Sequence, residues 1–238
     1  MGEPMEESSS EGAELVVYGM KGSPFVRKVQ VLLAEKGVDF ELTGVNIFPA
    51  PAWFAAINPA KRIPVLRDRS IGAEGAAGTI PDSSAICAYL ERKHPVPALY
   101  PSDAFAYGRA LWFEEYADSE LASHVGLGMF RPLVVKRLMG QEPDVERGRR
   151  TFRELLPPLF DYLDREIGDR AFLVGDAFSI ADIAVATQFV NLRFAGGSVD
   201  AARWPKLARY VANLHARPSF AACIEDESRS FAPGSYEL

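Results

Sequence analysis

The chain has 238 residues, which is enough for one large domain or two small ones with their own cores. Its 48% hydrophobic and 24% charged residues are ordinary for a soluble globular protein. The net charge is −6 and no basic block is present, which argues against nucleic acid or an anionic membrane as a partner. Cys87 and Cys223 lie far apart and match no metal-ligand spacing, so no metal site is expected.

The first 13 residues are acidic and rich in serine, and they lack the charged and apolar regions of a secretory signal. We expect residues 1–13 to form a disordered tail. The chain holds no apolar run long enough to span a bilayer, so cytoplasm is the expected location.

The stretch Glu14–Gly37 predicts a strand, a tight turn and a helix. Leu15–Val17 suits a buried strand, Ser23 is the expected helix N-cap, and Pro24 is the first helical residue. The Ser23 hydroxyl would therefore lie beside free backbone N–H groups, where the helix dipole favours negative charge. A sulfur anion held there would be stabilised. Capping alone is the alternative interpretation, because serine is a common N-cap.

A second strand is expected at Val38–Val45, parallel to the first through a helical crossover. A third strand is expected around Ile63–Leu66, although Pro64 cannot donate to a sheet ladder. A cis Ile63–Pro64 bond would present the Ile63 backbone to a peptide ligand as an added strand. A trans proline that opens an ordinary strand is the alternative, and proline statistics alone favour it.

The loop Ser70–Thr79 is rich in glycine and alanine and long for a hairpin, and its role is left open. A short strand resumes at Thr79 and Ile80. Asp82 and Ser83 then lie at the N-terminus of a helix predicted over Ala85–His94. Helix capping accounts for both residues on its own.

Residues 95–103 hold three prolines and are interpreted as a linker between two domains. Residues 104–238 show helical spacing only. One helix is expected to break or kink near Pro132, and another to kink or restart at Pro157 and Pro158. Ser179 to Asp182 forms a capping box before an apolar helix that we expect at the centre of the second domain.

Four motifs in this order resemble the cytosolic glutathione S-transferase family. They are S-P-F-x-x-K/R at Ser23, N-P-x-x-x-x-P-V-L at Asn58, D-S-x-A-I-x-x-Y-L at Asp82 and F-S-I-A-D at Phe178. The resemblance implies an α/β thioredoxin-like domain over residues 14–94, with the order β-α-β-α-β-β-α, a mixed four-stranded sheet and a cis proline. It implies an all-α helical bundle over residues 104–238. It also reverses the expectation for Ile63–Pro64, which we now predict to be cis.

The resemblance further implies that glutathione binds as a co-substrate and that no cofactor is permanently bound. Ser23 would donate a hydrogen bond to the glutathione thiolate while staying neutral. Tyr18 is the alternative hydroxyl, because some classes use a tyrosine at the end of the first strand. Asp82 and Ser83 would bind the γ-glutamyl end of the peptide.

The remaining glutathione contacts implied by the resemblance come from the region of the third strand and from the first helix. Ile63 and Pro64 would meet the cysteinyl portion, Arg62 and Lys61 would meet the glycyl carboxylate, and Phe25 would lie nearby. The electrophile would lie between the domains, against side chains drawn from Phe25, Trp112, Tyr116, Met129 and Phe130, each of which is also a candidate core residue.

The leading hypothesis is conjugation of glutathione to a hydrophobic electrophile by a serine-type enzyme of bacterial, tau, phi or theta kind, with the class left open. A glutathione-dependent isomerase or dehalogenase is the alternative within catalysis, and a non-catalytic binding protein is the alternative outside it. The serine where other classes carry cysteine argues against disulfide reduction. A homodimer is the family's usual state and is expected here.

Overall fold

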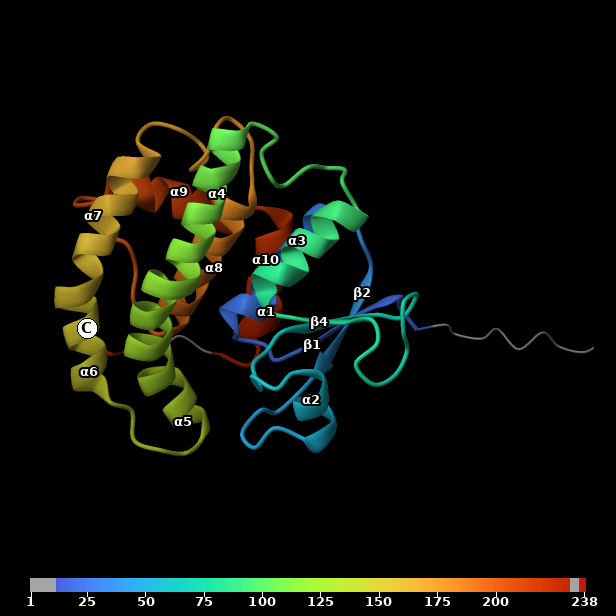
Figure 1. Ribbon diagram of the computed structural model, residues 1–238. Coiled ribbons are helices and arrows are strands. Elements are labelled where there is room, and N and C mark those ends of the chain that lie inside the picture. The colour runs from blue at the N-terminus through green and yellow to red at the C-terminus, as the bar shows by residue number, and fades with distance from the viewer. Residues whose placement is uncertain (1–11, 232–235) are drawn as a thin grey trace, which may run out of the picture.

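The computed structural model describes residues 12–231 and 236–238. A half that contains the sheet comes first in the chain, and a helical half follows it (Figure 1). The tail expected over residues 1–13 lies almost wholly outside the described residues.

The first half follows the expected order of strands and helices. Its elements are β1 Leu15–Gly19, α1 Pro24–Glu35, β2 Phe40–Gly44, α2 Ala52–Ile57, β3 Val65–Asp68, β4 Thr79–Pro81 and α3 Ser83–Lys93. The sheet order is β2-β1-β3-β4. β2 is parallel to β1, whereas β3 and β4 are antiparallel to their neighbours. The predicted mixed four-stranded sheet is confirmed.

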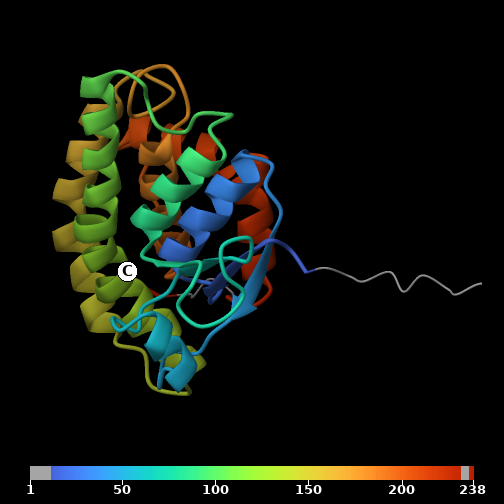
Figure 2. The ribbon, with the colours of Figure 1, turned by 45° about the vertical axis from the view of Figure 1, so that its right-hand side comes forward.

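Side-chain alternation along β1 gives the sheet two different faces. Leu15 and Val17 point into the main core, which they share with residues of α1 and α3. Tyr18 points to the other face, where it packs against a small cluster that includes Phe54 of α2 and Val65 of β3. Figure 2 shows α1 and α3 together on one side of the sheet, with α2 beyond its other face.

The backbone of the first half confirms two local predictions. Ser23 is the N-cap of α1 with Pro24 at the first helical position, and Gly37 lies just past the helix end with φ +63°. The Ile63–Pro64 peptide bond is cis, as the motif order predicted and as proline statistics alone did not.

The long loop before β4 folds around one buried side chain. The Arg67 guanidinium donates to the backbone carbonyls of Gly72, Gly75 and Ala77 at 2.7–2.9 Å. A buried guanidinium needs several acceptors, and the loop carbonyls supply them. The loop therefore forms a closed surface feature rather than a binding arm.

The second half begins with one long helical segment that changes its winding. Helix α4, Ala104–Tyr116, continues without a break as a π-wound stretch η1, Ala117–Val135, and ends in α5, Lys136–Leu138. Of the break or kink predicted near Pro132, the break is absent, because helical winding runs on through the proline. Hydrogen bonds to the fifth preceding residue, such as Lys136 N–H to Arg131 C=O, widen the turn, and the wider turn accommodates the proline ring.

The helices that complete the second half are α6 Val145–Arg150, the π-wound η2 Thr151–Leu155, α7 Leu156–Ile167, α8 Ile180–Phe194, α9 Pro205–His215 and α10 Pro218–Ser228. They show no interruption at Pro157 and Pro158, where a kink or restart was predicted, because α6, η2 and α7 follow one another without a break. Pro157 and Pro158 fall in the first turn of α7, immediately after the winding changes. Proline is tolerated there because first-turn N–H groups have no partner within the helix.

Helix α8 is the buried centre of the helical half, and nearly every residue along it is inaccessible to solvent. Its start is fixed by Asp182, whose carboxylate accepts hydrogen bonds from the N–H groups of Leu173 and Ser179, both at 2.9 Å, and from the Tyr210 hydroxyl at 2.8 Å. The predicted capping box is present.

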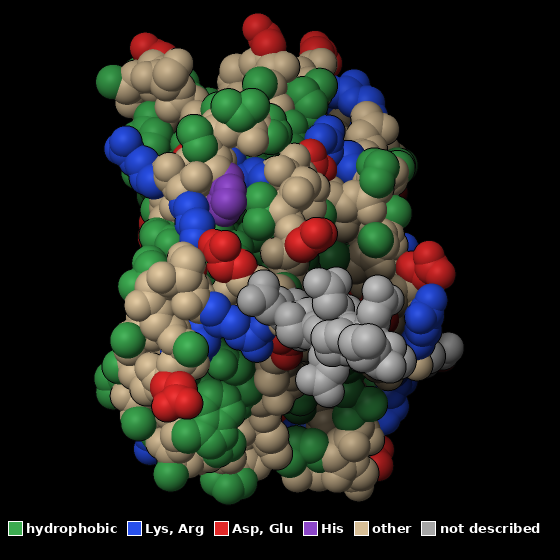
Figure 3. All heavy atoms as spheres, turned by 90° about the vertical axis from the view of Figure 1, so that its right-hand side faces the viewer, with side chains coloured by type: hydrophobic (Ala, Val, Ile, Leu, Met, Phe, Trp, Pro, Cys, Tyr) green, Lys and Arg blue, Asp and Glu red, His purple; other side chains and the backbone are tan. Residues whose placement is uncertain are grey.

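Helix α1 lies where the two halves meet. It contacts α3 on its own side and α8 and α10 of the helical half, and Figure 2 shows it between α3 and α10. On the face seen in Figure 3, acidic and basic side chains are interspersed rather than gathered into one basic patch. No helix among the described residues has both the length and the apolar character needed to cross a membrane.

Replacing Asp182 by alanine leaves four buried donors without this acceptor, the N–H groups of Leu173 and Ser179 and the hydroxyls of Ser179 and Tyr210, so we expect the free energy of unfolding to fall by roughly 3 kcal/mol. Chemical denaturation measures this, with Asp176→Ala at an exposed position as the control.

Burial raises the pKa of Asp182 from 3.8 to about 6, so the ionised form is disfavoured in the folded state. Stability from this group should therefore decrease as the pH rises from about 4 to about 6, and Asp182→Asn should abolish that slope.

Candidate functional site

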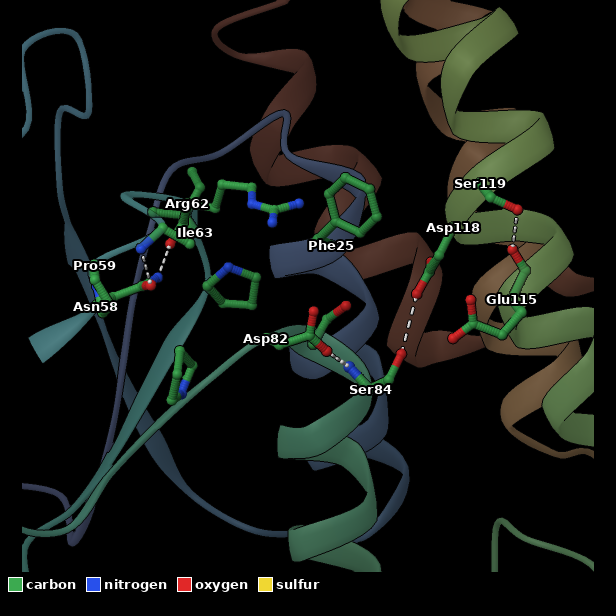
Figure 4. A pocket seen from close by; sticks show the side chains of 14 residues that line it. Phe25, Asn58, Pro59, Arg62, Ile63, Asp82, Ser84, Glu115, Asp118 and Ser119 are labelled. Carbon is green, nitrogen blue, oxygen red and sulfur yellow. Dashed lines mark hydrogen bonds between the residues drawn. The ribbon is translucent and has the colours of Figure 1, made fainter.

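A cavity of about 480 Å³ lies between the two halves of the molecule. From the sheet half it is lined by Phe25 in the first turn of α1, by the turn that leads into β3, and by the start of α3. From the helical half it is lined by Glu115, Asp118 and Ser119 on α4 and η1. Figure 4 shows the two walls facing each other across the opening.

The start of α3 contributes a strained residue, Asp82, and a helix N-terminus. Asp82 has φ +78° and ψ 132°, a conformation that non-glycine residues rarely adopt. Its carboxylate caps the helix by accepting from the N–H groups of Ser84 at 2.9 Å and Ala85 at 3.3 Å. Ser83, the first helical residue, is buried beside the cavity. The positive end of this helix suits a ligand carboxylate, and Asp82 suits an ammonium group.

The turn before β3 is held by Asn58, a residue that the sequence analysis gave no role of its own. Its side chain is buried, donates to the Arg62 carbonyl at 2.7 Å and accepts from the Ala60 N–H at 3.0 Å. These bonds fix the chain that enters the cis Ile63–Pro64 bond, and both residues line the cavity. The signal for Asn58 was its place in the N-P-x-x-x-x-P spacing, since asparagine often bonds the backbone of a turn.

Of the two basic residues predicted for this turn, only one borders the cavity. Arg62 lines it, and Figure 4 shows its guanidinium extended toward Phe25. Lys61 is exposed outside the lining, with φ +54° in the turn.

Ser23 lies at the end of α1 that carries Phe25. Its hydroxyl oxygen accepts from the Val26 N–H at 3.4 Å, a long bond. Among the described residues, the hydroxyl donates its own proton to no other group. A hydroxyl with this pattern retains a proton for an anion that arrives at the helix N-terminus.

The alternative hydroxyl, that of Tyr18, is engaged elsewhere. It accepts a hydrogen bond from the Arg67 side chain at 3.1 Å, and the Tyr18 ring packs edge-on against Trp53 on the α2 face of the sheet. Neither Tyr18 nor Ser23 is among the residues that line the cavity, and Ser23 lies two residues before Phe25, which does line it.

The aromatic and sulfur side chains expected around a second substrate are not gathered in this cavity. Met129 and Phe130 are buried in the core of the helical half. Trp112, although 47% exposed, donates to the Tyr162 hydroxyl at 2.7 Å, and Tyr116 stacks on the same two rings. Their place in the wall is taken by Glu115, Asp118 and Ser119, which share the next face of the same helical segment. Of the predicted set, Phe25 alone lines the cavity.

Behind the acidic wall lies a buried cation. The Lys28 ammonium group contacts Glu114 at 2.9 Å, Asp118 at 2.5 Å and the Ser84 hydroxyl at 3.0 Å, and the side chain has no exposed surface. Burial alone would lower the pKa of Lys28, but the Asp118 and Glu114 carboxylates raise it above its usual value. Lys28 is therefore charged and ties the starts of α1 and α3 to α4 and η1.

The cavity is lined by no cysteine thiol of this chain. Cys87 is fully buried in the core, and burial raises the pKa of the Cys223 thiol to about 11. Neither cysteine lines the cavity. Across the described residues there is no group of three histidine, cysteine, aspartate or glutamate side chains placed to hold a metal ion. Sulfur chemistry at this site therefore requires a thiol supplied by a ligand.

Comparison with known proteins gives consistent matches over both halves. A family model for the glutathione S-transferase N-terminal domain matches residues 17–98, and one for the C-terminal domain matches residues 112–213. The uncharacterized GST-like protein YibF of Escherichia coli is 32% identical over 86% of this chain and 96% of its own. Rat maleylacetoacetate isomerase is 28% identical over 86% of this chain and 89% of its own.

Solved structures agree with the sequence matches. A glutathione S-transferase from Rhodospirillum rubrum is 30% identical, with a TM-score of 0.77 over 88% of this chain and 91% of its own. One from Methylobacterium radiotolerans, solved in complex with glutathione sulfonate, is 32% identical, with a TM-score of 0.69 over 88% of this chain and 94% of its own. The sheet-plus-bundle fold, the cis proline and these matches together show that the chain belongs to the glutathione S-transferase family.

Proposed function

We propose that the protein is a glutathione transferase that joins the sulfur of glutathione to an electrophilic carbon. The observation that carries the proposal is the convergence on one cavity of the α3 N-terminus at Asp82 and Ser83, the cis Ile63–Pro64 edge and the first turn of α1. A peptide with a carboxylate, an ammonium group and a thiol finds a matching group at each position. The glutathione sulfonate bound to the Methylobacterium radiotolerans relative supports the same ligand.

The binding arrangement assigns each end of glutathione to one element. The γ-glutamyl carboxylate meets Ser83 and the N–H groups at the start of α3, while its ammonium group meets the Asp82 carboxylate. The cysteinyl backbone pairs with Ile63 as an added strand. Arg62 meets the glycyl carboxylate, with Lys61 as a more distant basic group.

The chemical step requires the thiol to lose its proton. A free thiol has a pKa of about 8.5, and lowering it by about 2 units takes roughly 2.7 kcal/mol of preferential stabilisation of the anion. The Ser23 hydroxyl and the α1 N-terminus supply this together, because both present a partial positive charge to the sulfur. The thiolate then attacks the electrophile and the leaving group departs, with no covalent bond formed to the protein.

The charge and the apolar surface of the cavity walls favour conjugation over an isomerase reaction, the alternative activity within catalysis. The relatives named maleylacetoacetate isomerase act on a substrate whose name denotes an acid, and the same thiolate would serve that chemistry. Here Glu115 and Asp118 make the facing wall acidic, which disfavours an anionic second substrate. We therefore propose an uncharged electrophile whose apolar surface rests on Phe25. The homodimer and the cytoplasmic location expected from the sequence stay predictions.

Ser23→Ala should lower turnover by about 10- to 100-fold, the loss expected for one hydrogen bond to an anion, and should leave the dissociation constant for glutathione nearly unchanged. Without the donor, the pKa of the bound thiol rises, so the acid limb of the kcat profile should move to higher pH. Steady-state kinetics with a panel of electrophiles measures both effects. Tyr18→Phe is the matched control, and a loss of turnover in that variant instead would assign activation to Tyr18.

Asp82→Asn removes the negative charge while keeping an N-cap residue that tolerates positive φ, so α3 should stay intact. We expect glutathione to bind about 10-fold more weakly, because the ammonium group loses a charged partner, and turnover at saturation to change little. Isothermal titration measures the affinity. Asp103→Asn, at the cap of α4, is the matched control. Equal affinities in wild type and Asp82→Asn would exclude this binding arrangement and favour a non-catalytic role.

A further inference from the structure

The loop that carries Ser23 is held on both sides of that residue by the helical half of the protein. The Gly22 N–H donates to the Glu227 carboxylate at 3.1 Å, and the Asn191 side-chain amide donates to the Gly22 carbonyl at 3.0 Å. The Thr187 hydroxyl donates to the Pro24 carbonyl at 3.0 Å. Backbone groups immediately before and after Ser23 are therefore bound to α8 and α10.

One buried side chain joins the three residues that hold the loop. Arg27, with no exposed surface, donates to Glu227 at 2.5 and 2.9 Å, to the Asn191 oxygen at 2.9 Å, and to the Thr187 carbonyl at 2.8 Å. The guanidinium is rigid and planar, so it fixes these acceptors relative to one another. Arg27 itself lies on α1, four residues after Ser23. The Ser23 loop, α1 and the three residues that hold the loop (Thr187, Asn191 and Glu227, together called the clamp) therefore form one hydrogen-bonded network.

The packing around Gly22 leaves the loop little freedom to move. Gly22 has φ +82°, and a side chain there would collide with the ring of Phe231, which follows α10. Phe231 in turn packs edge-on against Phe130 and against Phe194 of α8. The Phe231 ring therefore packs directly against Gly22.

A buried ion pair is a weak way to stabilise a fold, because desolvation offsets most of the attraction. Three hydrogen bonds to the three-residue stretch Gly22–Pro24 are better explained by a need for fixed geometry. The other end of the α1–α10 contact supplies a comparison: Glu35 accepts from Arg217 at 2.7 Å and from Ser219 at 2.5 Å, and neither bond reaches the Ser23 loop.

We propose that Asn191, Thr187 and Glu227 are positioning residues that set the direction of the Ser23 hydroxyl, so that thiol activation depends on the helical half. This inference rests on the proposed function. The groups assigned to glutathione binding, Asp82, Ser83 and Ile63, make no hydrogen bond to these three residues among the described contacts. Activation and binding are therefore separable.

The test uses two variants that each remove one donor to the loop and keep the shape of the side chain. Asn191→Asp keeps an oxygen for Arg27 but cannot, when ionised, donate to the Gly22 carbonyl. Thr187→Val loses the bond to the Pro24 carbonyl, and it carries the test if Asn191→Asp does not fold. Glu35→Gln is the matched control, because it weakens the same α1–α10 contact without touching the loop.

The measurement is the pKa of the thiol of glutathione bound to each full-length protein, followed by the ultraviolet absorbance of the thiolate against pH. We expect the bound-thiol pKa to rise by about one unit in both loop variants, from about 6.5 to about 7.5, which is about threefold less thiolate at pH 7. The dissociation constant for glutathione, measured at about pH 5.5 where the bound thiol is mostly protonated in every protein, should stay within about twofold, a change of at most about 0.4 kcal/mol. Glu35→Gln should lower thermal stability and leave the thiol pKa unchanged.

Two outcomes would overturn the inference, and they differ in what else they overturn. If wild-type protein lowers the thiol pKa and the loop variants lower it equally, the clamp is structural only and the proposed function stands. If wild-type protein binds no glutathione, the proposed function and the inference fail together.

Discussion

The burial of two adjacent cations on α1 is the constraint on which the rest of the structure depends. Removing a charge from water costs several kcal/mol, and the cost is offset only when counter-charges are placed accurately. Arg27 forms an ion pair with Glu227 on α10, and Lys28 forms ion pairs with Glu114 on α4 and Asp118 on η1. Both cations are paired in this arrangement, which ties α1 to α10 through Arg27 and to α4 and η1 through Lys28. The Ser23 loop and the cavity wall take their positions from it.

Much of the sheet half could be predicted because its signals are local in the chain. A capping serine, a following proline and a closing glycine mark the two ends of α1, and Asp82 marks the start of α3 as its N-cap in the same way. The capping box at Ser179 and Asp182 was readable for the same reason. The cis bond at Ile63–Pro64 was different: general proline behaviour predicted trans, and the order of several motifs was needed to predict cis.

The features that were missed depend on partners far away in the sequence. Arg27 and Lys28 have the pattern of ordinary surface charges, and their counter-charges lie 200 and 86 residues further along the chain. The acidic wall was missed because helical spacing does not reveal which face of α4 meets the cavity. Trp112 and Tyr116 turn instead toward Tyr162 of α7, and the π winding of η1 shifts the facing side chains that follow.

The arrangement divides the proposed chemistry between the two halves of the molecule. The groups assigned to the γ-glutamyl and cysteinyl parts of glutathione come from the sheet half alone, around Asp82 and Ile63. The orientation of Ser23, in contrast, is fixed through Gly22 and Pro24 by side chains of α8 and α10. Loosening the contact between the halves would therefore be expected to release the thiol from activation before it releases the peptide from its site. In such a protein, glutathione stays bound when the contact between the two halves loosens, whereas the reactivity of its thiol depends on that contact remaining intact.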